Sequence, residues 1–255
     1  MDFHFPSDEN LPFKMYPPRP EHCLQFYPKD TETVKYPNSN IVIAKKKACL
    51  TGQHTIVNHR YVGREFVTFQ VVFQPGVLYR ITGIKIQELS NHYLDAEDIF
   101  GTSLRLINEE LFRAECYSEM IQIVEQFLRS LIKNMKKDQH PVDVVAKLML
   151  LSHEQYSVDN FLKESCLSHR QFDRKFKERI GIAPKQFLQV IRFDRAYRMK
   201  NKFPDKDWLS VALHCGYHDY QHMAKDYKQF TGYTPTKFFE IDNKAPERFF
   251  GDAEV

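Results

Sequence analysis

The sequence predicts an α+β fold, with a small β-rich N-terminal domain that also contains helices and an all-α C-terminal domain. Two observations lead to this prediction: β-branched and aromatic runs lie in the first third of the chain, and an internal repeat lies near its end. A chain of 255 residues, 42% of them hydrophobic, is long enough for one large or two ordinary domains. We expect an N-terminal domain at residues 1–137, a linker at 138–141, a C-terminal domain at 142–240 and a tail at 241–255.

The N-terminal domain should be β-rich between residues 34 and 83. Before this region, prolines are frequent from Met1 to Pro37, which favours extended segments and loops over helices. Strand-like runs then occupy residues 41–43, 65–73 and 77–81, and a Pro75-Gly76 turn separates the last two. We therefore expect a small antiparallel sheet or a partial barrel.

Helical spacing takes over at residues 104–136. From Ser118, a plausible helix cap, to Lys136, the apolar residues form one stripe: Ile121, Val124, Leu128, Leu131 and Met135. The stripe has two interpretations. It packs on the N-terminal sheet, as amphipathic helices usually do, or it forms a homodimer contact through Ser118–Lys136, because the same spacing suits paired helices.

The C-terminal domain contains one helix plan twice, at an offset of 51 residues. Each copy begins with a residue that can cap a helix, and a glycine and a proline follow its end. The aligned pairs are Ser168 and Asp219, Phe172 and Met223, Phe176 and Tyr227, Lys177 and Lys228, Gly181 and Gly232, Pro184 and Pro235, and Phe187 and Phe238. The large apolar members should form the cores of the two copies rather than contact bases.

A shorter helical segment precedes each copy, at residues 158–164 and 209–214, so the pattern of helix, tight turn and helix occurs twice. Gly216 suits a left-handed residue in the second turn, whereas Cys166 occupies the comparable place in the first. Between the copies we expect one helix from Lys185 to Lys202 that ends before Pro204. The domain should therefore hold two helix-turn-helix units joined by a rigid linker helix.

With these motifs, residues 142–240 resemble the AraC/XylS family of bacterial transcription regulators. The resemblance implies sequence-specific binding of double-stranded DNA, with two recognition helices in adjacent major grooves about one helical turn apart. It also implies contact with RNA polymerase, although repression fits the same residues as well as activation. The N-terminal domain is more loosely similar to the ligand-binding barrels of the family, which leaves an unknown small-molecule effector open.

Helical geometry selects the DNA-binding candidates of the first recognition helix, in which Phe172 and Phe176 should face inward. The opposite face presents His169, Arg170, Asp173, Arg174 and Lys177. Arg170 and Arg174 are the best candidates, because a guanidinium can donate two parallel hydrogen bonds to guanine O6 and N7. Asp173 either accepts from cytosine N4 or orients Arg170 across one turn.

In the second recognition helix, Met223 and Tyr227 should face inward. The outward side chains are Tyr220, Gln221, Ala224, Lys225 and Lys228, with His222 nearby. Gln221 could pair with adenine, and Lys225 could reach a base or a phosphate. Because Asp219 and Asp226 make this helix less basic, we expect it to read less sequence. Phosphate contacts are expected from N–H groups at helix starts and from Lys185, Arg192 or Lys206.

The net charge of +3 is unevenly distributed: residues 1–141 are neutral, residues 142–240 carry +5 and the tail carries −2. This excess predicts a moderate, salt-sensitive attraction to DNA. The five cysteines are widely spaced without a C-x-x-C pair, which is typical of reduced thiols in the cytoplasm. We expect no membrane partner, because no apolar stretch approaches the ~20 residues that a membrane-spanning helix needs.

Other chemistry finds little support in the sequence. His54 and His59 could suggest a metal site, but a cupin-type site needs closely alternating histidines and a carboxylate, so we predict no metal and no cofactor. The chain lacks the G-x-S-x-G, phosphate-loop and H-E-x-x-H motifs, and we do not expect an enzyme.

The alternative function is a protein-interaction module that has kept the fold without specific DNA binding, for example an antagonist that pairs with a related regulator through Ser118–Lys136. Acidic residues on or beside the recognition helices favour this alternative: Asp173, Asp219 and Asp226. The basic residues on the same helices argue against it: Arg170, Arg174, Lys225 and Lys228.

Overall fold

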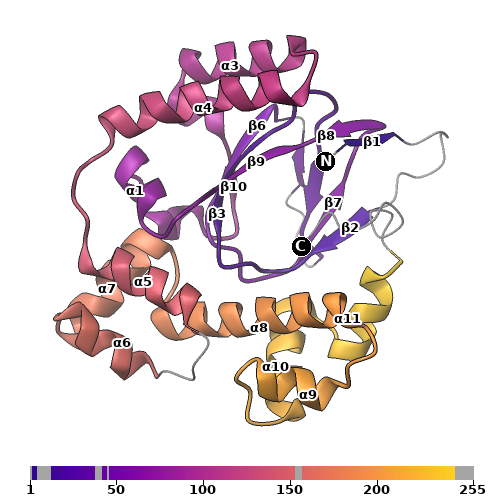
Figure 1. The fold of residues 1–255 in the computed structure, drawn as a ribbon, viewed down its shortest axis with the longest axis vertical. Coiled ribbons are helices and arrows are strands. Elements are labelled where there is room, and N and C mark those ends of the chain that lie inside the picture. The colour runs from indigo at the N-terminus through magenta and orange to yellow at the C-terminus, as the bar shows by residue number, and fades with distance from the viewer. Residues whose placement is uncertain (1, 5–12, 38–41, 45, 153–156, 245–255) are drawn as a thin grey trace.

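Strands dominate the N-terminal part of the computed structural model, which describes residues 2–4, 13–37, 42–44, 46–152 and 157–244 (Figure 1). The strands are β1 (Asp2–His4), β2 (Phe13–Tyr16), β3 (His22–Phe26), β4 (Thr33–Lys35), β5 (Val42–Ala44), β6 (Ala48–Thr51), β7 (Asn58–Tyr61), β8 (Glu65–Val67), β9 (Phe69–Phe73) and β10 (Tyr93–Asp95). Two four-stranded antiparallel sheets have the orders β10-β6-β3-β9 and β2-β7-β4-β5, and β1 pairs with β8. The β-rich N-terminal domain of the predicted α+β fold is thus confirmed.

Two expectations about the extent of the β-rich region are wrong. Residues 22–26, in the stretch expected to hold extended segments and loops, form β3, an inner strand that pairs with both β6 and β9 and is buried along its whole length. The prolines of this region instead separate strands, since Pro17, Pro18 and Pro20 lie between β2 and β3. The β-rich region therefore begins well before residue 34. Of the expected strand at 41–43, Ile41 lies outside the described residues.

The strand expected at residues 77–81 is also wrong, because Val77–Thr82 forms helix α1. Gly76 and Gly83 adopt left-handed φ angles of 79° and 74° at its two ends and so separate it from the preceding strand. A short apolar run does not distinguish a strand from a buried helix turn by periodicity, and Leu78 is fully buried in the core of this domain.

Helices cover the sheet that contains β3. They are η1 (Ile86–Leu89), α2 (Ala96–Phe100), α3 (Thr102–Arg113) and α4 (Tyr117–Asn134). Met120, Val124 and Phe127 of α4 join the buried cluster that also holds Leu24 and Phe26 of β3. The expectation that the long helix packs on its own sheet is therefore correct.

The details of the α4 stripe need correction. The buried stripe is rotated from the expected one, because Ile121 is 45% exposed and Met135 lies beyond the last helical residue. Ser118 is not the cap, since the helix already begins at Tyr117 after Cys116. The rotation arises because apolar residues surround more than one side of this helix, so that spacing alone does not select the buried side.

The C-terminal domain is all-α, as predicted, with two helix-turn-helix units joined by a linker helix. Its helices are α5 (Pro141–Leu151), α6 (Val158–Ser165), α7 (His169–Ile180), α8 (Pro184–Lys202), α9 (Trp208–His214), α10 (Tyr220–Thr231) and α11 (Pro235–Asp242). The linker helix starts at Pro184, which fits the preference for proline in the first turn. No helix among the described residues is both long and apolar enough to cross a membrane, and residues 245–255 of the tail lie outside them.

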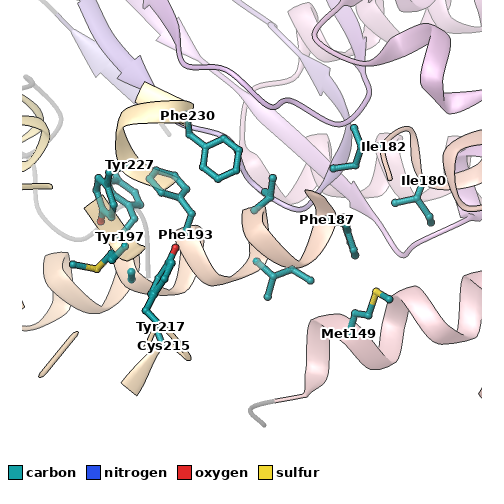
Figure 2. Close-up of a cluster of buried hydrophobic side chains, with 14 of the residues drawn as sticks. Met149, Ile180, Ile182, Phe187, Phe193, Tyr197, Cys215, Tyr217, Tyr227 and Phe230 are labelled. Atoms are coloured by element: carbon teal, nitrogen blue, oxygen red, sulfur yellow. The ribbon is translucent and has the colours of Figure 1, made fainter. Parts of the chain in front are cut away.

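One hydrophobic cluster runs through both helix-turn-helix units along α8. Phe187 packs against Phe176 at one end of α8, with ring centroids 5.6 Å apart, and Phe193 packs against Tyr227 at 4.7 Å further along. Figure 2 shows Phe187 near Ile180 and Ile182, and Phe193 among the aromatic rings of the second unit. The repeated aromatic residues are core residues, as predicted: Phe172, Phe176, Phe187, Tyr227 and Phe238 are at most 1% exposed.

Candidate nucleic-acid interface

The first helix-turn-helix unit consists of α6 and α7. Both helices begin with a capping box, in which Ser157 pairs with Asn160 and Ser168 pairs with Gln171. Each box satisfies N–H groups that would otherwise lack partners at the helix start. Cys166 adopts a left-handed φ of 53° in the turn, a conformation that is uncommon for a side chain with Cβ. The sharp turn that a glycine would favour is therefore made here without one.

The second unit consists of α9 and α10, and its turn contains Gly216 at a φ of 83°. Asp207 accepts a hydrogen bond from the N–H of Ser210 at 2.9 Å, and Asp219 accepts one from the N–H of His222 at 2.7 Å. Cys166 and Gly216 thus adopt the same class of backbone conformation, as the alignment of the two turns indicates. The Asp219 carboxylate serves as a cap, which reduces its effect on an approaching phosphate.

Helix α8 connects the two units and fixes their separation. Its 19 residues correspond to a length of about 28 Å at 1.5 Å per residue. Figure 1 places α6 and α7 at one end of α8 and α9 and α10 toward the other. Because Phe187 and Phe193 belong to the cores of different units, neither unit can move away from α8 without exposing aromatic surface.

The outer face of α7 is open to solvent and mostly basic. His169, Arg170, Arg174 and Lys177 are exposed, and Asp173 is half-buried. Asp173 Oδ2 lies 2.8 Å from Lys177 Nζ, so Asp173 forms an ion pair with Lys177 rather than with Arg170. Arg174 pairs loosely with Glu178 at 3.8 Å. These pairs are weak at a surface, so both basic side chains can exchange their carboxylate for a phosphate or a base edge.

The outer face of α10 is open as well but carries fewer charges. Gln221, Lys225 and Lys228 are exposed, whereas Tyr220, His222 and Ala224 are half-buried. Asp226 does not face outward, contrary to the expectation that it weakens this face. It is 3% exposed, 3.7 Å from Arg192 of α8, and accepts a hydrogen bond from Gln189 at 3.3 Å. Its charge therefore acts inside the domain.

The expected phosphate contacts on and after α8 differ in accessibility. Lys185 is exposed at the start of α8, and Lys206 is half-buried before α9. Arg192 is directed to Asp226 and lies 5.3 Å from the ring of Tyr217, so it is part of the anchor of α10. The expectation that Arg192 is available to DNA is not supported by this geometry, because the acidic partner lies on the next helix.

Sequence reasoning overlooked His218, which is exposed in the second turn. Its ring stacks on that of His222 with centroids 5.5 Å apart. Burial lowers the pKa of His222, with a further contribution from Arg192. The sequence signal that could have identified His218 is its position four residues before His222, because side chains at this spacing can lie close together around the start of a helix.

The histidines of the N-terminal domain lie apart from this interface. His54 is buried beside Tyr93, and burial lowers its pKa to about 3, with a further lowering by Arg60. His59 stacks on Phe13 with ring centroids 4.6 Å apart. Within the described ranges, no group of three or more histidine, cysteine, aspartate or glutamate side chains could hold a metal ion.

Two capped helix-turn-helix units on one linker helix, each with an accessible outer face, define a DNA-binding helix-turn-helix domain. Residues 161–241 match a family model described as a helix-turn-helix domain. The HTH-type transcriptional regulator ArgR of Pseudomonas aeruginosa is 29% identical over 106 residues, which are 41% of this chain and 32% of ArgR. The HTH-type transcriptional regulator MtrA of Neisseria gonorrhoeae is 25% identical over 95 residues, which are 37% of this chain and 31% of MtrA. Over this segment the chain is thus similar to HTH-type transcriptional regulators, and the matched residues form a helix-turn-helix domain.

Similarity of fold extends beyond the helix-turn-helix domain. The matching segments span about a third of the length of ArgR and MtrA. The structure of ToxT from Vibrio cholerae instead matches 91% of this chain and 95% of its own length, with a TM-score of 0.51 and 11% identity. A ToxT structure with bound unsaturated fatty acid matches 96% of this chain and 94% of its own, again with a TM-score of 0.51. At such low identity the likeness shows a shared fold of both domains and nothing about ligands.

Proposed function

We propose that this chain is a sequence-specific DNA-binding transcription regulator whose two recognition helices, α7 and α10, read adjacent major grooves of one site. The observation that supports it most is the pair of accessible outer faces held at a fixed separation by α8. The net charge of +5 on residues 142–240 is consistent with a moderate electrostatic attraction to phosphates. The full set of candidate contacts is His169, Arg170, Asp173, Arg174, Lys177, Tyr220, Gln221, His222, Lys225 and Lys228.

Most of the base recognition is assigned to Arg170 and Arg174. Both are exposed on one face of α7, and neither has a buried partner that would hold it away from DNA. A gel-shift titration of the full-length chain on a duplex selected from a random pool tests this assignment. Arg170→Ala with Arg174→Ala should weaken specific binding far more than nonspecific binding, and an unchanged sequence preference would overturn it.

The antagonist alternative loses part of its support, because Asp226 is buried and Asp219 caps α10. It remains distinguishable by experiment: an interaction module without DNA binding would give no salt-dependent shift. The regulator proposal includes contact with RNA polymerase, which the resemblance implies. It also includes a cytoplasmic location, which the scattered cysteines favour, and a role without catalysis. Transcription from a selected site in a reconstituted reaction tests the polymerase contact directly.

One cavity of the N-terminal domain is too small for an organic effector. Between the two sheets, a cavity lined by Tyr16, Cys23, His54 and Arg60 among others has a volume of about 10 Å³, enough for one water molecule. The bound fatty acid belongs to ToxT. We infer that a small-molecule effector enters this cavity only if the two sheets separate, and thermal-shift screening of metabolites tests whether one exists.

A homodimer through α4 remains part of the proposal, through the exposed apolar side chains that lie beside the buried stripe of this helix. Tyr117, Ile121 and Ile132 are 53%, 45% and 59% exposed and lie on one side of the helix. Glu125 and Arg129, 3.6 Å apart, border this side, and an antiparallel two-fold pairing would bring the glutamate of one copy near the arginine of the other. Ile121→Asp with Ile132→Asp should shift sedimentation to the monomer, and a wild-type monomer at all concentrations would contradict the dimer.

A further inference from the structure

The N-terminal domain contacts the C-terminal end of both recognition helices. At α7, His22 Nε2 of β3 lies 2.8 Å from the carbonyl oxygen of Ile180, and Ser90 Oγ donates to the carbonyl oxygen of Gly181 over 3.0 Å. At α10, the backbone N–H of Val57 donates to the carbonyl oxygen of Phe230 over 2.8 Å. The N-terminal domain thus supplies three donors to the ends of two helices that are far apart in the sequence.

These contacts involve equivalent parts of the repeat. The offset of 51 aligns residues 179–181 with residues 230–232, so the acceptors come from the same few positions in each copy. The last carbonyl groups of a helix have no partner within that helix. These carbonyl groups are therefore available to another domain. A hydrogen bond to a backbone carbonyl group holds the end of the helix itself, whereas a bond to a side chain would hold only a mobile group.

Side chains and a close fit reinforce the contact at α7. Tyr79 OH donates to Glu178 over 2.8 Å, and the Arg179 guanidinium lies 4.5 Å from the centre of the Tyr79 ring. A Cβ at Gly181 would lie only 2.9 Å from Ser90 Oγ, so a larger residue would push the domains apart. The contact requires the close approach that glycine permits.

The Arg179 side chain extends the same contact to the linker between the domains. It is 1% exposed and donates two hydrogen bonds to Asp143 of α5, at 2.7 and 2.6 Å. A third bond, at 3.2 Å, reaches Asp138 of the linker. Such bidentate pairs have a defined geometry, so α7 is oriented relative to both α5 and the N-terminal domain.

The contacts leave the outer faces of the recognition helices free. Arg170, Arg174, Gln221 and Lys225 are exposed, and all of them precede the last turn of their helices. Helix α8 fixes the distance between the units, but each unit meets α8 through a short connection, at residues 181–183 and 203–207. Because the N-terminal domain contacts both units, it restricts the rotation of each unit about its connection to α8.

We propose that the N-terminal domain sets the relative rotation of the two recognition helices, with His22, Ser90 and the Val57 backbone as positioning groups, and so determines the half-site spacing that the chain accepts. This inference rests on the DNA-binding function proposed above. Shifting one half-site by a single base pair rotates it by about 35° around the DNA axis, since one turn holds 10–10.5 base pairs. A rigidly held pair of helices cannot follow that rotation, and a loosely held pair can.

The experiment compares the full-length chain with its His22→Ala/Ser90→Ala variant. Duplexes carry the two half-sites found by selection, at the selected spacing and with one base pair added or removed. The wild type should discriminate strongly against both altered spacings. The variant should lose about fivefold or more of this discrimination, which is the change that two ordinary hydrogen bonds support. A defect in folding would instead reduce active protein equally for all three duplexes.

Ser130→Ala is the matched control, because Ser130 Oγ donates to the carbonyl oxygen of Phe127 within the N-terminal domain and touches neither recognition helix. It should keep the wild-type spacing preference. If the double variant does not fold, Ser90→Ala alone is compared with the wild type and should lose a smaller part of the discrimination between half-site spacings. A folded variant with unchanged spacing preference, or with tighter binding at every spacing, overturns the inference. A wild type without sequence-specific binding overturns the proposed function instead.

Discussion

The two helix-turn-helix units have the same architecture but different chemistry at equivalent positions. Arg170 and Arg174 of α7 align with Gln221 and Lys225 of α10. An arginine suits guanine and a glutamine suits adenine, whereas a lysine is a point charge without fork geometry. The two units thus present side chains at equivalent positions of their recognition helices, but these side chains suit different bases. One DNA site should therefore consist of two half-sites with different sequences.

The units also differ in how their recognition helices are anchored. Lys175 of α7 forms a half-buried pair with Glu178, whereas its equivalent Asp226 is buried against Arg192 of α8. Helix α7 is held instead through Arg179, by groups at the junction of the domains. The second unit is therefore anchored to the linker helix, and the first is anchored to the N-terminal side of the chain.

The largest expected difference between the units concerns their cores. Phe176→Ala should lower the free energy of unfolding by about 3–5 kcal/mol, because it leaves a cavity between α7 and α8. The aligned change Tyr227→Phe should be neutral or slightly stabilising, since the buried Tyr227 hydroxyl has no hydrogen-bond partner among the described residues. Urea unfolding of both variants measures the difference. A large loss for Tyr227→Phe would show that the hydroxyl has a polar partner.

The next difference concerns base recognition. Arg170→Ala should cost about 1–3 kcal/mol of discrimination at one base pair of the first half-site. Gln221→Ala should relax a different base pair in the second half-site, by the same amount or less, because α10 has fewer cationic neighbours. Binding of each variant to a panel of single-base substitutions measures both effects. Equal loss at every substituted position would mean that these side chains contact only the backbone.

The helix caps should differ little between the units. Ser168→Ala and Asp219→Ala each remove an acceptor for the first-turn N–H groups and should each lower stability by about 1 kcal/mol. Asp219→Ala also removes a negative charge beside the DNA-facing surface, so its DNA affinity at low salt should fall less than that of Ser168→Ala. Thermal unfolding and a salt titration of binding separate the two consequences.

The smallest predicted effect is the pH dependence of the second anchor. Burial raises the pKa of Asp226, partly offset by Arg192, so the folded state favours the protonated carboxyl more than the unfolded state does. The contribution of this group to stability is therefore present at low pH and lost as pH rises through its folded pKa. The free energy of unfolding of Asp226→Asn, relative to the wild type, should rise as the pH increases from below the ordinary aspartate pKa of about 3.9 through the higher folded pKa of Asp226. A pH-independent difference would contradict the raised pKa.

The C-terminal domain was predictable because its local signals agree with its packing. Ser168, Asp219 and the paired glycines and prolines mark helix ends, and the four-residue spacing of Phe172 and Phe176 selects the buried side. The position of Asp226 was not predictable, because it depends on Arg192 approaching from another helix. A carboxylate on the flank of a recognition helix has the same sequence pattern whether it faces solvent or a neighbouring cation.

The N-terminal domain was less predictable, since its local signals are ambiguous. Strand β3 is buried along its whole length and shows no alternation of apolar and polar residues, and the prolines near it indicated only extended segments and loops. Helix α1 has the composition of a strand. The contacts of His22, Ser90 and Val57 with the recognition helices join distant segments, and no spacing in the sequence reveals them.

Hydroxyl-radical footprinting of the full-length chain on a selected duplex tests the central claim most directly. We expect two protected segments on one face of the DNA, centred about 10 base pairs apart. The protection should weaken as salt is raised, and Arg170→Ala with Arg174→Ala should remove one segment before the other. A single protected segment, or two on opposite faces, would contradict the account of two recognition helices reading adjacent grooves.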